Sequence, residues 1–578
     1  MNMEKTSKKP VRILGIGPEV WISSAALLEN GKITAAVAEE RFNRQKASRE
    51  FPNKAIDYCL KEAGIKFEDI DYVAIGWNPA IHLKSYNYRF SKAARWRAEY
   101  LYSVPNHLIA LMADKKVDYI EQNLCQKDKK CQIIYLNHHT AHAANAFYLS
   151  PYKEAAILTV DGRGEDATAL FAVGRDNKIQ ELRTVEYPHS LGLVYTTFTQ
   201  FLGFQIHVDE WKVMALASYG TRNNKYYRVL KKMFHLKPDG RFENDLRYFD
   251  YYLHDRNHFW SPKLTKIFGE PRILDSEITQ RHQDIAAALQ QVTEDVLAHM
   301  LNCLHKETGM KNLAVGGGTF MNSVFNGKIT KLTPFKNVFI SSCPDDSGIS
   351  MGAASYVYHH ILGNPRCGEQ THNFYGPSIT NQQIEADLKK YGQKSIYVNN
   401  IEKYAAKLIS KGKIVGWFQD KMEFGQRALG NRSILADPRD PQMKEKVNMV
   451  IKYRENFRPF APSVLEEEVH KYFECPKNSK VPFMEKVYEI KRSKQKVIPA
   501  VTHIDGTGRL QTVSRATNPK YYKLIKEFKN LTGIPIVLNT SFNLKGEPIV
   551  CTPTDAIRTF HSSGMDALIM GKYVLLKD

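Results

Sequence analysis

The sequence predicts an α/β fold in which a duplicated first domain is followed by a second α/β domain. Strand-like apolar runs at residues 11–17 and 72–77 flank an amphipathic helical segment at residues 53–64. Such alternation of strands and helices is typical of α/β architecture. Two strand–turn–strand openings, near Gly15 and near Asp161, indicate that the first domain contains a similar unit twice.

The second of these units continues the same pattern. Strand-like runs at residues 155–162 and 168–174 pair around the turn GRGED, and a further strand is predicted at 178–187. A long helix at residues 283–309 then leads into a strand at 312–317. Periodic apolar positions of this length predict one extended helix packed on a sheet.

A change in composition separates the two domains. Residues 364–378 are rich in Gly, Pro and Asn and lack hydrophobic periodicity, as is typical of a linker. Beyond them the alternation resumes, with a helix predicted at 401–412 and a strand at 413–418. We therefore place the first domain at residues 1–368 and the second at residues 369–578.

Overall composition indicates a globular protein of the cytoplasm. The chain has 578 residues, of which 43% are hydrophobic and 25% charged, which suits two or three domains with their own cores. No apolar run is long enough for a membrane span, and the N-terminal run is too short for a signal peptide. The eight cysteines are scattered without a CxxC pair, which predicts reduced thiols.

The formal net charge of +20 predicts an anionic partner, such as a nucleotide, a phosphorylated substrate, nucleic acid or acidic lipid. Basic residues are interleaved with aromatic residues at 82–130 and 221–241, a pattern that suits RNA or a charged glycan. A solvated helical surface whose aromatic side chains face the core explains the same pattern. We favour that second explanation, so nucleic acid is not the expected partner.

Two histidines and an aspartate form a candidate metal site. His138 and His142 are four residues apart, so they lie on one face of the helix that NHHTAHAANAF predicts. Asp161 ends a strand-like run, and imidazole with carboxylate is a normal ligand set for zinc, iron or manganese. A metalloprotease motif needs Glu directly after the first His, where this chain has His139. The alternative is two unrelated helix histidines and a strand-end aspartate.

Two turns add further candidates. Asp345 and Asp346 precede a helix of small residues, where a carboxylate could complete a metal site or simply cap the helix. The three glycines at 316–318 follow a strand and precede a predicted helix, which would let a phosphate approach backbone N–H groups. There is no GK[ST], so this is not a P-loop, and a tight turn is the alternative.

The second domain carries a dense set of cations and small polar residues. Arginine forks bind phosphate and carboxylate oxygens bidentately, so an anion pocket is favoured over ordinary salt bridges. The set comprises Lys421, Arg427, Arg432, Arg439, Lys452, Arg454, Arg458, His503, Arg509, Asn539, Ser541 and Asn543.

These motifs together resemble those of the O-carbamoyltransferase family, which includes nodulation-factor, cephamycin and tobramycin carbamoyltransferases. In the first domain the matching motifs are AEERFNRQK, HHTAH, VDGRGE, HSLGLVY, EWKVMALASYG, GGGTFMNSVFNG and PDDSG. In the second they are FGQRALGNRSILADPR, RENFRPFAPS, HIDGTGR and NTSFN. They occur in the order found in the family, and the resemblance covers almost the whole chain.

The resemblance implies an actin-like first domain of the sugar-kinase type and a YrdC-like second domain. It implies that the second domain makes carbamoyl adenylate from carbamoyl phosphate and ATP with Mg²⁺. The first domain would then transfer the carbamoyl group to a hydroxyl of a sugar, glycan or natural product. A divalent metal is implied in the first domain, with Fe²⁺ favoured over Mn²⁺ and Zn²⁺. The basic charge would suit an anionic acceptor, and a homodimer is an open alternative to a monomer.

The same resemblance implies roles for individual residues. The metal ligands would be His138, His142, Asp161 and Asp346. The catalytic residues acting on carbamoyl phosphate and ATP would be Lys46, Arg427, Lys452, Arg458 and Arg509. The other residues that bind substrate or nucleotide would be Gly316, Gly317, Gly318, Asn322, Asn539, Ser541 and Asn543.

One departure from the family pattern lies near the N-terminus. Where the family has consecutive His and Asp, this chain has Trp21 and Ile22. The family histidine is a candidate for accepting the proton of the acceptor hydroxyl. Without it, either another group such as Glu19 or His139 serves, or the acceptor differs, or transfer is impaired. Two alternatives stay open: a tRNA-modifying relative of the threonylcarbamoyl transfer enzymes, and a degenerate nucleotide-binding regulator.

Overall fold

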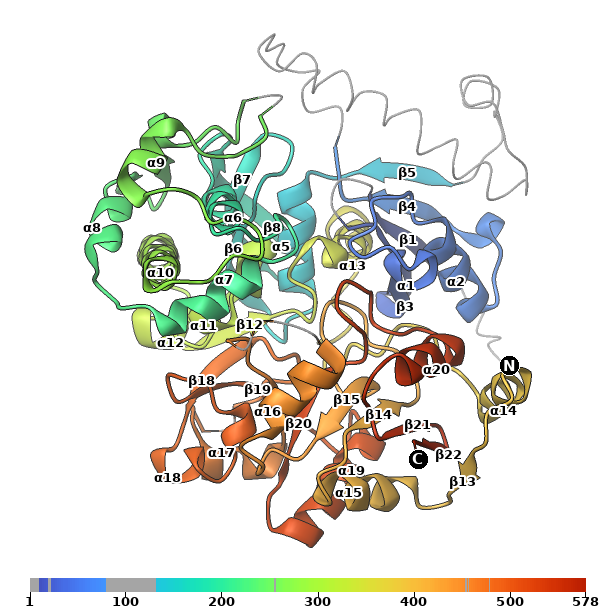
Figure 1. Ribbon diagram of the computed structural model, residues 1–578. Helices are drawn as coiled ribbons and strands as arrows, with labels where there is room; N and C mark the ends of the chain where they lie inside the picture. The colour runs from blue at the N-terminus through green and yellow to red at the C-terminus, as the bar shows by residue number, and fades with distance from the viewer. Residues whose placement is uncertain are drawn as a thin grey trace, which may run out of the picture.

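The computed structural model describes residues 10–18, 22–78, 131–253, 256–452, 455, 457–477 and 479–577. Trp21, Glu19, Arg454 and the basic stretch 82–130 therefore lie outside the described residues. Within the described part, the predicted α/β class is confirmed: two five-stranded sheets form the first domain and a ten-stranded sheet forms the second (Figure 1).

The first sheet has the strand order β3-β2-β1-β4-β5. Its first three strands are antiparallel neighbours, whereas β1, β4 and β5 run parallel. The strands are β1 (Arg12–Gly17), β2 (Ser24–Glu29), β3 (Lys32–Ala38), β4 (Tyr72–Ile75) and β5 (Gln132–Tyr135).

The second sheet repeats this arrangement, with β6 in the place of β1. Its order is β12-β11-β6-β7-β8, and again three antiparallel strands continue into a parallel pair. The strands are β6 (Glu154–Val160), β7 (Ala167–Arg175), β8 (Lys178–Glu186), β11 (Asn312–Gly316) and β12 (Asn337–Ile340). The duplication predicted from the two strand–turn–strand openings is thus present, as an actin-like first domain requires.

Two helices fill the space between these sheets. Helix α5 (His138–Tyr148) packs on β6, β7 and β11, and α13 (Ile349–Tyr356) packs on β1, β2 and α5. Both are rich in small residues, and Gly352 is required where a Cβ would lie 2.0 Å from the Ala141 carbonyl oxygen. This close packing brings the start of α5 next to the turn that precedes α13.

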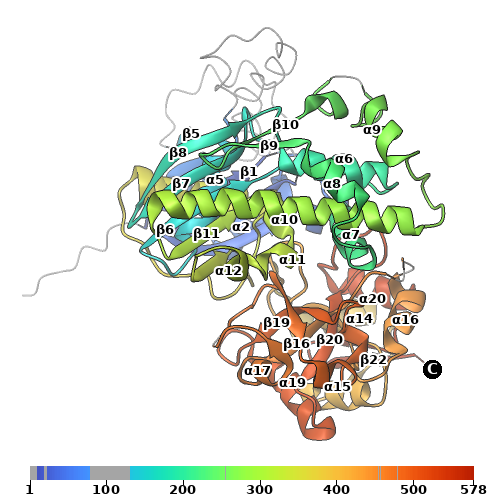
Figure 2. The same cartoon turned by 90° about the vertical axis from the view of Figure 1, so that its left-hand side faces the viewer.

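The opposite side of the second sheet is covered by α10 (Gln280–Thr308), which ends at Gly309 in the left-handed conformation. Figure 2 shows this helix along its whole length. The remaining elements of the first domain are α1 (Glu40–Asn43), α2 (Asn53–Ala63), α6 (Leu191–Phe201), α7 (Glu210–Leu216), α8 (Lys225–Lys231), β9 (Phe234–Leu236), β10 (Phe242–Asn244), α9 (Pro262–Phe268), α11 (Ser323–Asn326) and α12 (Ile329–Leu332).

The second domain is built on one mixed sheet, ordered β13-β22-β21-β14-β15-β20-β16-β19-β18-β17. Alternate residues of β20 enter different cores: Ile536 and Leu538 face one, and Val537 faces the other. The strands are β13 (Ile396–Tyr397), β14 (Val415–Phe418), β15 (Arg432–Ala436), β16 (Ala461–Leu465), β17 (Phe473–Glu474), β18 (Lys486–Ile490), β19 (Thr507–Val513), β20 (Ile536–Ser541), β21 (Ala567–Met570) and β22 (Tyr573–Leu576).

Helices cover both faces of this sheet. They include α15, which corresponds to the helix predicted at 401–412 and packs against α19. The helices are α14 (Asn381–Lys390), α15 (Ile401–Ser410), α16 (Met443–Val447), α17 (Val469–Tyr472), α18 (Arg492–Gln495), α19 (Pro519–Thr532) and α20 (Pro553–His561).

The stretch predicted as a linker contains no helix or strand, but it is packed against the rest of the chain. The Gln370 side chain accepts a hydrogen bond from the backbone of Ser342 in the first domain. The Asn373 side chain donates to the carbonyl of Phe424 in the second domain. The linker therefore fastens the two domains together. Among the described residues, no helix is long and apolar enough to cross a bilayer.

Candidate active site

One cavity of about 1380 Å³ lies between the two domains. The first domain contributes Lys46, Asp161, Gly318, Asn322 and Asp346 to its wall. The second contributes Arg427, Lys452, Arg458, Arg509, Asn539, Ser541 and Asn543. Most residues that the sequence pointed to thus face one space, although they come from both ends of the chain.

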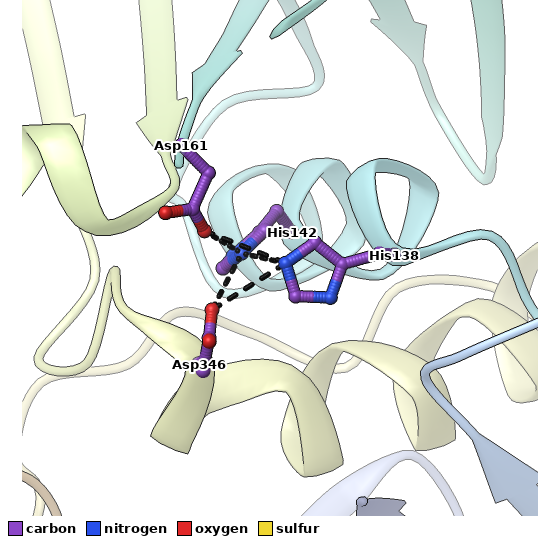
Figure 3. Close-up of side chains that lie close together, drawn as sticks. All are labelled: His138, His142, Asp161 and Asp346. Atoms are coloured by element: carbon purple, nitrogen blue, oxygen red, sulfur yellow. Dashed lines mark hydrogen bonds and ion pairs between the residues drawn. The ribbon is translucent and has the colours of Figure 1, made fainter. Parts of the chain in front are cut away.

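The four predicted metal ligands converge at the first-domain end of this cavity (Figure 3). His142 Nε2 lies 2.8 Å from Asp161 Oδ2 and 3.3 Å from Asp346 Oδ1. His138 Nε2 lies 3.4 Å from each of the same two carboxylate oxygens. The four ligand atoms are all within 4.8 Å of one another, which is close enough for one ion to contact them all.

The fold places each of these side chains at the end of an element. His138 and His142 stand one turn apart at the start of α5, and Asp161 directly follows β6. Asp346 opens the turn before α13. Because the C-terminal ends of the parallel neighbours β6 and β11 are adjacent, the site lies at the edge where ligands of open α/β sheets commonly bind.

Glu165 holds the start of α5 in place. Its carboxylate accepts hydrogen bonds from the backbone N–H of His138, at 3.1 Å, and of Asn78, at 2.6 Å. The side chain of Asn137, at the N-cap position, makes no capping bond. A buried carboxylate from the GRGED turn therefore satisfies an N-terminal helix donor and fixes the backbone of a candidate ligand.

The charges at this site are tightly coupled. Burial alone would lower the pKa of His138, but Asp346 and Asp161 raise it well above the ordinary value. Burial would raise the pKa of Asp161, yet hydrogen bonds from His138 and His142 lower it well below the usual range. A positive charge on the His138 imidazole and the negative charges of the two carboxylates therefore stabilise each other.

The donor set fits a divalent cation. Asp346 Oδ1 is buried and has no hydrogen-bond donor in the described part of the chain, although it faces both imidazole Nε2 atoms. Two imidazole nitrogens and two carboxylate oxygens directed at one point suit Fe²⁺, Mn²⁺ or Zn²⁺. The sequence prediction that these four residues lie together is matched by their geometry.

The glycine turn packs closely against two neighbouring elements. A Cβ on Gly316 would lie 2.9 Å from the His142 carbonyl oxygen, and one on Gly317, where φ is +92°, would lie 2.2 Å from the Val160 carbonyl oxygen. Gly316 and Gly317 therefore allow the end of β11 to pack closely against α5 and β6. Of the three glycines, only Gly318 lines the cavity. The turn leads into a 3₁₀ segment and then into the helix predicted after it, the four-residue α11.

Asn322, which also lines the cavity, is held by Gln290 of α10. Its side-chain amide donates to Gln290 Oε1 at 2.8 Å, and its own oxygen accepts from the backbone of Phe325. The side chain thus caps α11 while remaining on the cavity wall. Lys46 lies on the same wall. Burial lowers the pKa of its ammonium group, and the negative charge of Glu40 offsets only part of this effect.

Three arginines of the second domain line the same cavity. Burial, together with the charges of Arg427 and Arg458, holds the pKa of Arg509 well below its usual value. Burial also lowers the pKa of Arg427, and the negative charge of Asp345 offsets only part of this effect. Burial and the neighbouring Asp346 carboxylate raise the pKa of Asp345 to about 6. Buried cations that repel one another are stabilised when an anion binds between them.

Lys452 is the centre of a polar group beside the arginines. Its Nζ donates to the Ser541 carbonyl at 2.6 Å, to the Asn543 carbonyl at 2.8 Å and to Asn543 Oδ1 at 2.9 Å. The Asn539 amide donates to Ser463 Oγ and Gln511 Oε1, which leaves its buried Oδ1 without a hydrogen-bond partner among the described residues. This group therefore offers a ligand the positive charge of Lys452 and the Asn539 Oδ1 acceptor.

Not every cation that the sequence grouped together reaches the cavity. Arg432 is fully buried against Phe418 and donates to backbone carbonyls, including that of Gln419. Arg439 pairs with Asp437, and Lys421 pairs with Glu62 of the first domain. These three have structural roles that their sequence context did not distinguish from the others.

Sequence reasoning also missed residues that line the cavity, notably His207 and Trp211. The backbone of His207 is left-handed, with φ of +61°. Burial and the charge of Arg49 lower the pKa of its imidazole to about 4, although the charge of Asp346 acts in the opposite direction. Ile22 lies on the cavity wall, but His139 does not, and His139 Nδ1 lies 2.7 Å from Thr159 Oγ1. The motif EWKVMALASYG was the only signal for this wall, and it carried no assigned role.

Comparison with known proteins identifies the family. The family model of the carbamoyltransferase N-terminus matches residues 12–355, and that of the carbamoyltransferase C-terminus matches residues 406–577. A protein of Synechocystis sp. described as uncharacterized protein sll1178 is 38% identical over 98% of this chain and 96% of its own length. Nodulation protein NolNO of Sinorhizobium fredii is 36% identical over 96% of this chain and 78% of its own length.

Solved structures show only a distant likeness. HypF of T. kodakarensis is 13% identical, covering 61% of this chain and 49% of its own, with a TM-score of 0.33. Component A of the (R)-2-hydroxyglutaryl-CoA dehydratase of Acidaminococcus fermentans is 14% identical, covering 61% and 99%, with a TM-score of 0.31. Likeness at this level does not indicate function. The two family matches together span most of the sequence, and this chain is a transferase enzyme that belongs to the carbamoyltransferase family.

Proposed function

We propose that this carbamoyltransferase is an ATP-dependent O-carbamoyltransferase that activates its carbamoyl group as an adenylate. Carbamoyl phosphate and water would give carbamate and phosphate, and carbamate would then attack the α-phosphorus of ATP with release of pyrophosphate. The single observation that supports this is the shared cavity, whose wall contains both a cation cluster and carboxylates of the candidate metal site.

The second-domain residues would bind the phosphate groups. Arg427, Arg458 and Arg509 offer guanidinium forks that neutralise phosphate charge as bonds break. Lys452 is held by three oxygen acceptors, which fixes its ammonium group as a point charge. The unpaired Asn539 Oδ1 offers an acceptor for the carbamoyl N–H₂ group. The sequence-predicted residues Ser541 and Asn543 would orient Lys452.

In the first domain, His138, His142, Asp161 and Asp346 would hold a divalent ion. When bound, such an ion supplies Lewis-acid polarisation of the carbamoyl oxygen or orients the adenylate phosphate. The acceptor hydroxyl would then attack the carbamoyl carbon, and AMP would leave with the electrons of the broken C–O bond. Because residues of both sites line one cavity, the adenylate need not enter bulk water, where it would hydrolyse.

Residues 221–241, the described part of the basic and aromatic sequence, support a small acceptor over nucleic acid. Within residues 221–241, Tyr226 and Phe234 are buried in the core, and Arg222 pairs with Glu294. This matches a solvated surface with inward aromatic side chains. We therefore expect an acceptor of small-molecule, sugar or glycan type.

Incubation of the full-length chain with carbamoyl phosphate, ATP and Mg²⁺ tests the proposal. We expect release of both phosphate and pyrophosphate, and mass spectrometry of candidate acceptors should show the carbamoyl mass increment. Absence of pyrophosphate release from metal-loaded, folded protein would contradict it. The matched control omits carbamoyl phosphate, so that simple hydrolysis of ATP is measured separately.

A further inference from the structure

Helix α7 of the first domain makes a closed ring of contacts with the second domain at the cavity wall. The guanidinium carbon of Arg458 lies 3.8 Å from the ring centroid of Trp211. The adjacent Lys212 Nζ lies 3.2 Å from Glu455 Oε1, and Glu455 Oε2 lies 3.2 Å from Arg458 Nη1. Lys212 is also anchored within its own domain by Asp209, at 2.9 Å.

Each member of this ring is held in place. The Trp211 indole N–H donates to the Val208 carbonyl at 2.8 Å, which fixes the ring plane. The side chains of Lys212 and Arg458 are only 10% and 12% exposed. Burial would raise the pKa of Glu455, but a hydrogen bond from its own backbone N–H and the charges of Lys212 and Arg458 lower it to about 2, so the carboxylate is ionised between two cations.

Arg458 depends on this ring for its orientation. Its guanidinium contacts Trp211 and Glu455, and its buried Nε has no hydrogen-bond partner in the described part of the chain. A guanidinium that stacks on an indole keeps its plane while its free N–H edge stays available. Since Arg458 also lines the cavity, that edge is available to an anion within it.

We propose that Trp211 and Lys212 are positioning residues for the phosphate-binding wall, so that the first domain completes the site at which carbamoyl phosphate is activated. Trp211 fixes the plane of Arg458. Lys212 offsets the charge of Glu455, which would otherwise compete with phosphate for the same guanidinium. The inference rests on the proposed function, because it assigns phosphate binding to Arg458.

The ring is not required simply to join the domains. Arg44 donates to the carbonyls of Pro548 and Ile549, and Arg41 donates to the carbonyl of Gly425. These contacts between the first and second domains lie outside the ring. Replacing Trp211 therefore leaves other contacts across the interface. A change in the KM for carbamoyl phosphate would then reflect the positioning of Arg458.

Steady-state pyrophosphate release by full-length Trp211→Ala, Trp211→Phe and Trp260→Phe variants provides the kinetic test. We expect Trp211→Ala to raise the KM for carbamoyl phosphate about tenfold, with a smaller change in kcat, because an unstacked guanidinium must be ordered at each binding event. Phe keeps an aromatic face and should restore much of the loss. Trp260, which stacks on His258 away from the cavity, is the matched control and should leave KM unchanged.

Lys212 gives a second and independent arm. Lys212→Met should raise the same KM, and Lys212→Arg should restore it, because only the charge facing Glu455 is needed. An unchanged KM in both Trp211→Ala and Lys212→Met, with normal wild-type turnover, would overturn the inference while leaving the proposed function intact. Absence of turnover in the wild type would instead contradict the proposed function.

A binding measurement without turnover separates these cases further. Titration of the protein with carbamoyl phosphate, in the absence of ATP, should change tryptophan fluorescence as the anion reaches Arg458. We expect Trp211→Phe to lose most of this change and Trp260→Phe to retain it. A full fluorescence change in Trp211→Phe would place the anion away from this ring and overturn the inference. A single cooperative thermal transition in each variant would establish that the domains remain associated.

Discussion

His142 Nε2 and Asp161 Oδ2 lie 2.8 Å apart, although one belongs to a helix between the two sheets and the other to the end of a central strand. This contact exists because α5 packs directly on β6. The glycine turn after β11 lies close to both elements, which a side chain at Gly316 or Gly317 would prevent. It brings an imidazole and a carboxylate to the point that His138 and Asp346 also face.

Loss of a candidate ligand should remove the metal. Even partners that only orient metal ligands commonly change metal affinity by about 10–100-fold, so we expect His142→Ala to purify with less than about a tenth of the wild-type content of divalent metal. Elemental analysis of the purified chain is the measurement. His235→Ala, at an exposed histidine of β9, is the control. Full metal content in His142→Ala would refute the ligand assignment.

Glu165 should matter for metal affinity without being a ligand. Glu165→Gln keeps the shape of the side chain but removes the charge that accepts the N–H groups of His138 and Asn78. We expect metal affinity to fall on the order of tenfold, as measured by competition with a chelator. An affinity equal to that of the wild type would show that α5 positions His138 without this carboxylate.

The cavity arginines should differ from those with structural partners. Arg509→Ala should lower kcat/KM for carbamoyl phosphate by about 10–100-fold, the equivalent of one or two charge-assisted hydrogen bonds. Arg439→Ala, which removes contacts with Asp437, the Ser410 carbonyl and the Phe528 ring outside the cavity, is the matched control. Equal losses in the two variants would mean that the effect is one of stability and not of anion binding.

Two glycines with positive φ should respond differently to alanine. A Cβ on Gly309, where φ is +64°, has nothing within 4 Å, so Gly309→Ala should cost only about 1 kcal/mol of backbone strain. A Cβ on Gly317 would lie 2.2 Å from the Val160 carbonyl oxygen, so Gly317→Ala should cost more than about 3 kcal/mol. Urea unfolding of both variants measures this, and similar values would argue against the close approach at Gly317.

Glu455 should contribute stability that depends on pH. Its pKa is lowered from 4.5 to about 2, so its contribution is complete above pH 4.5 and is lost as the pH falls toward 2. The difference in free energy of unfolding between wild type and Glu455→Gln should therefore be constant above pH 4.5 and shrink below it. Denaturant titrations at several pH values provide the measurement. A difference that does not shrink on acidification would rule out an ionised Glu455 between Lys212 and Arg458.

The sequence by itself determined the features that depend on local periodicity or spacing. The strands of the duplicated unit, the helix carrying His138 and His142, and the strand end at Asp161 were predictable, because neighbouring residues decide them. The assignments of Arg427 and Arg509 to an anion site came from motif resemblance. Local sequence could not separate them from Arg432, whose partners are backbone carbonyls supplied by the fold.

Tertiary structure alone decided the rest. The glycines at 316 and 317 are required by carbonyl groups of α5 and β6, which no local pattern reveals. Trp211 gained its significance from Arg458 in the other domain. Long-range contacts of this kind depend on how two domains close around a cavity, whereas sequence patterns report only on the surroundings of each residue along the chain. The sequence therefore pointed to many of the residues on each wall, but it could not show that the two walls meet in one cavity.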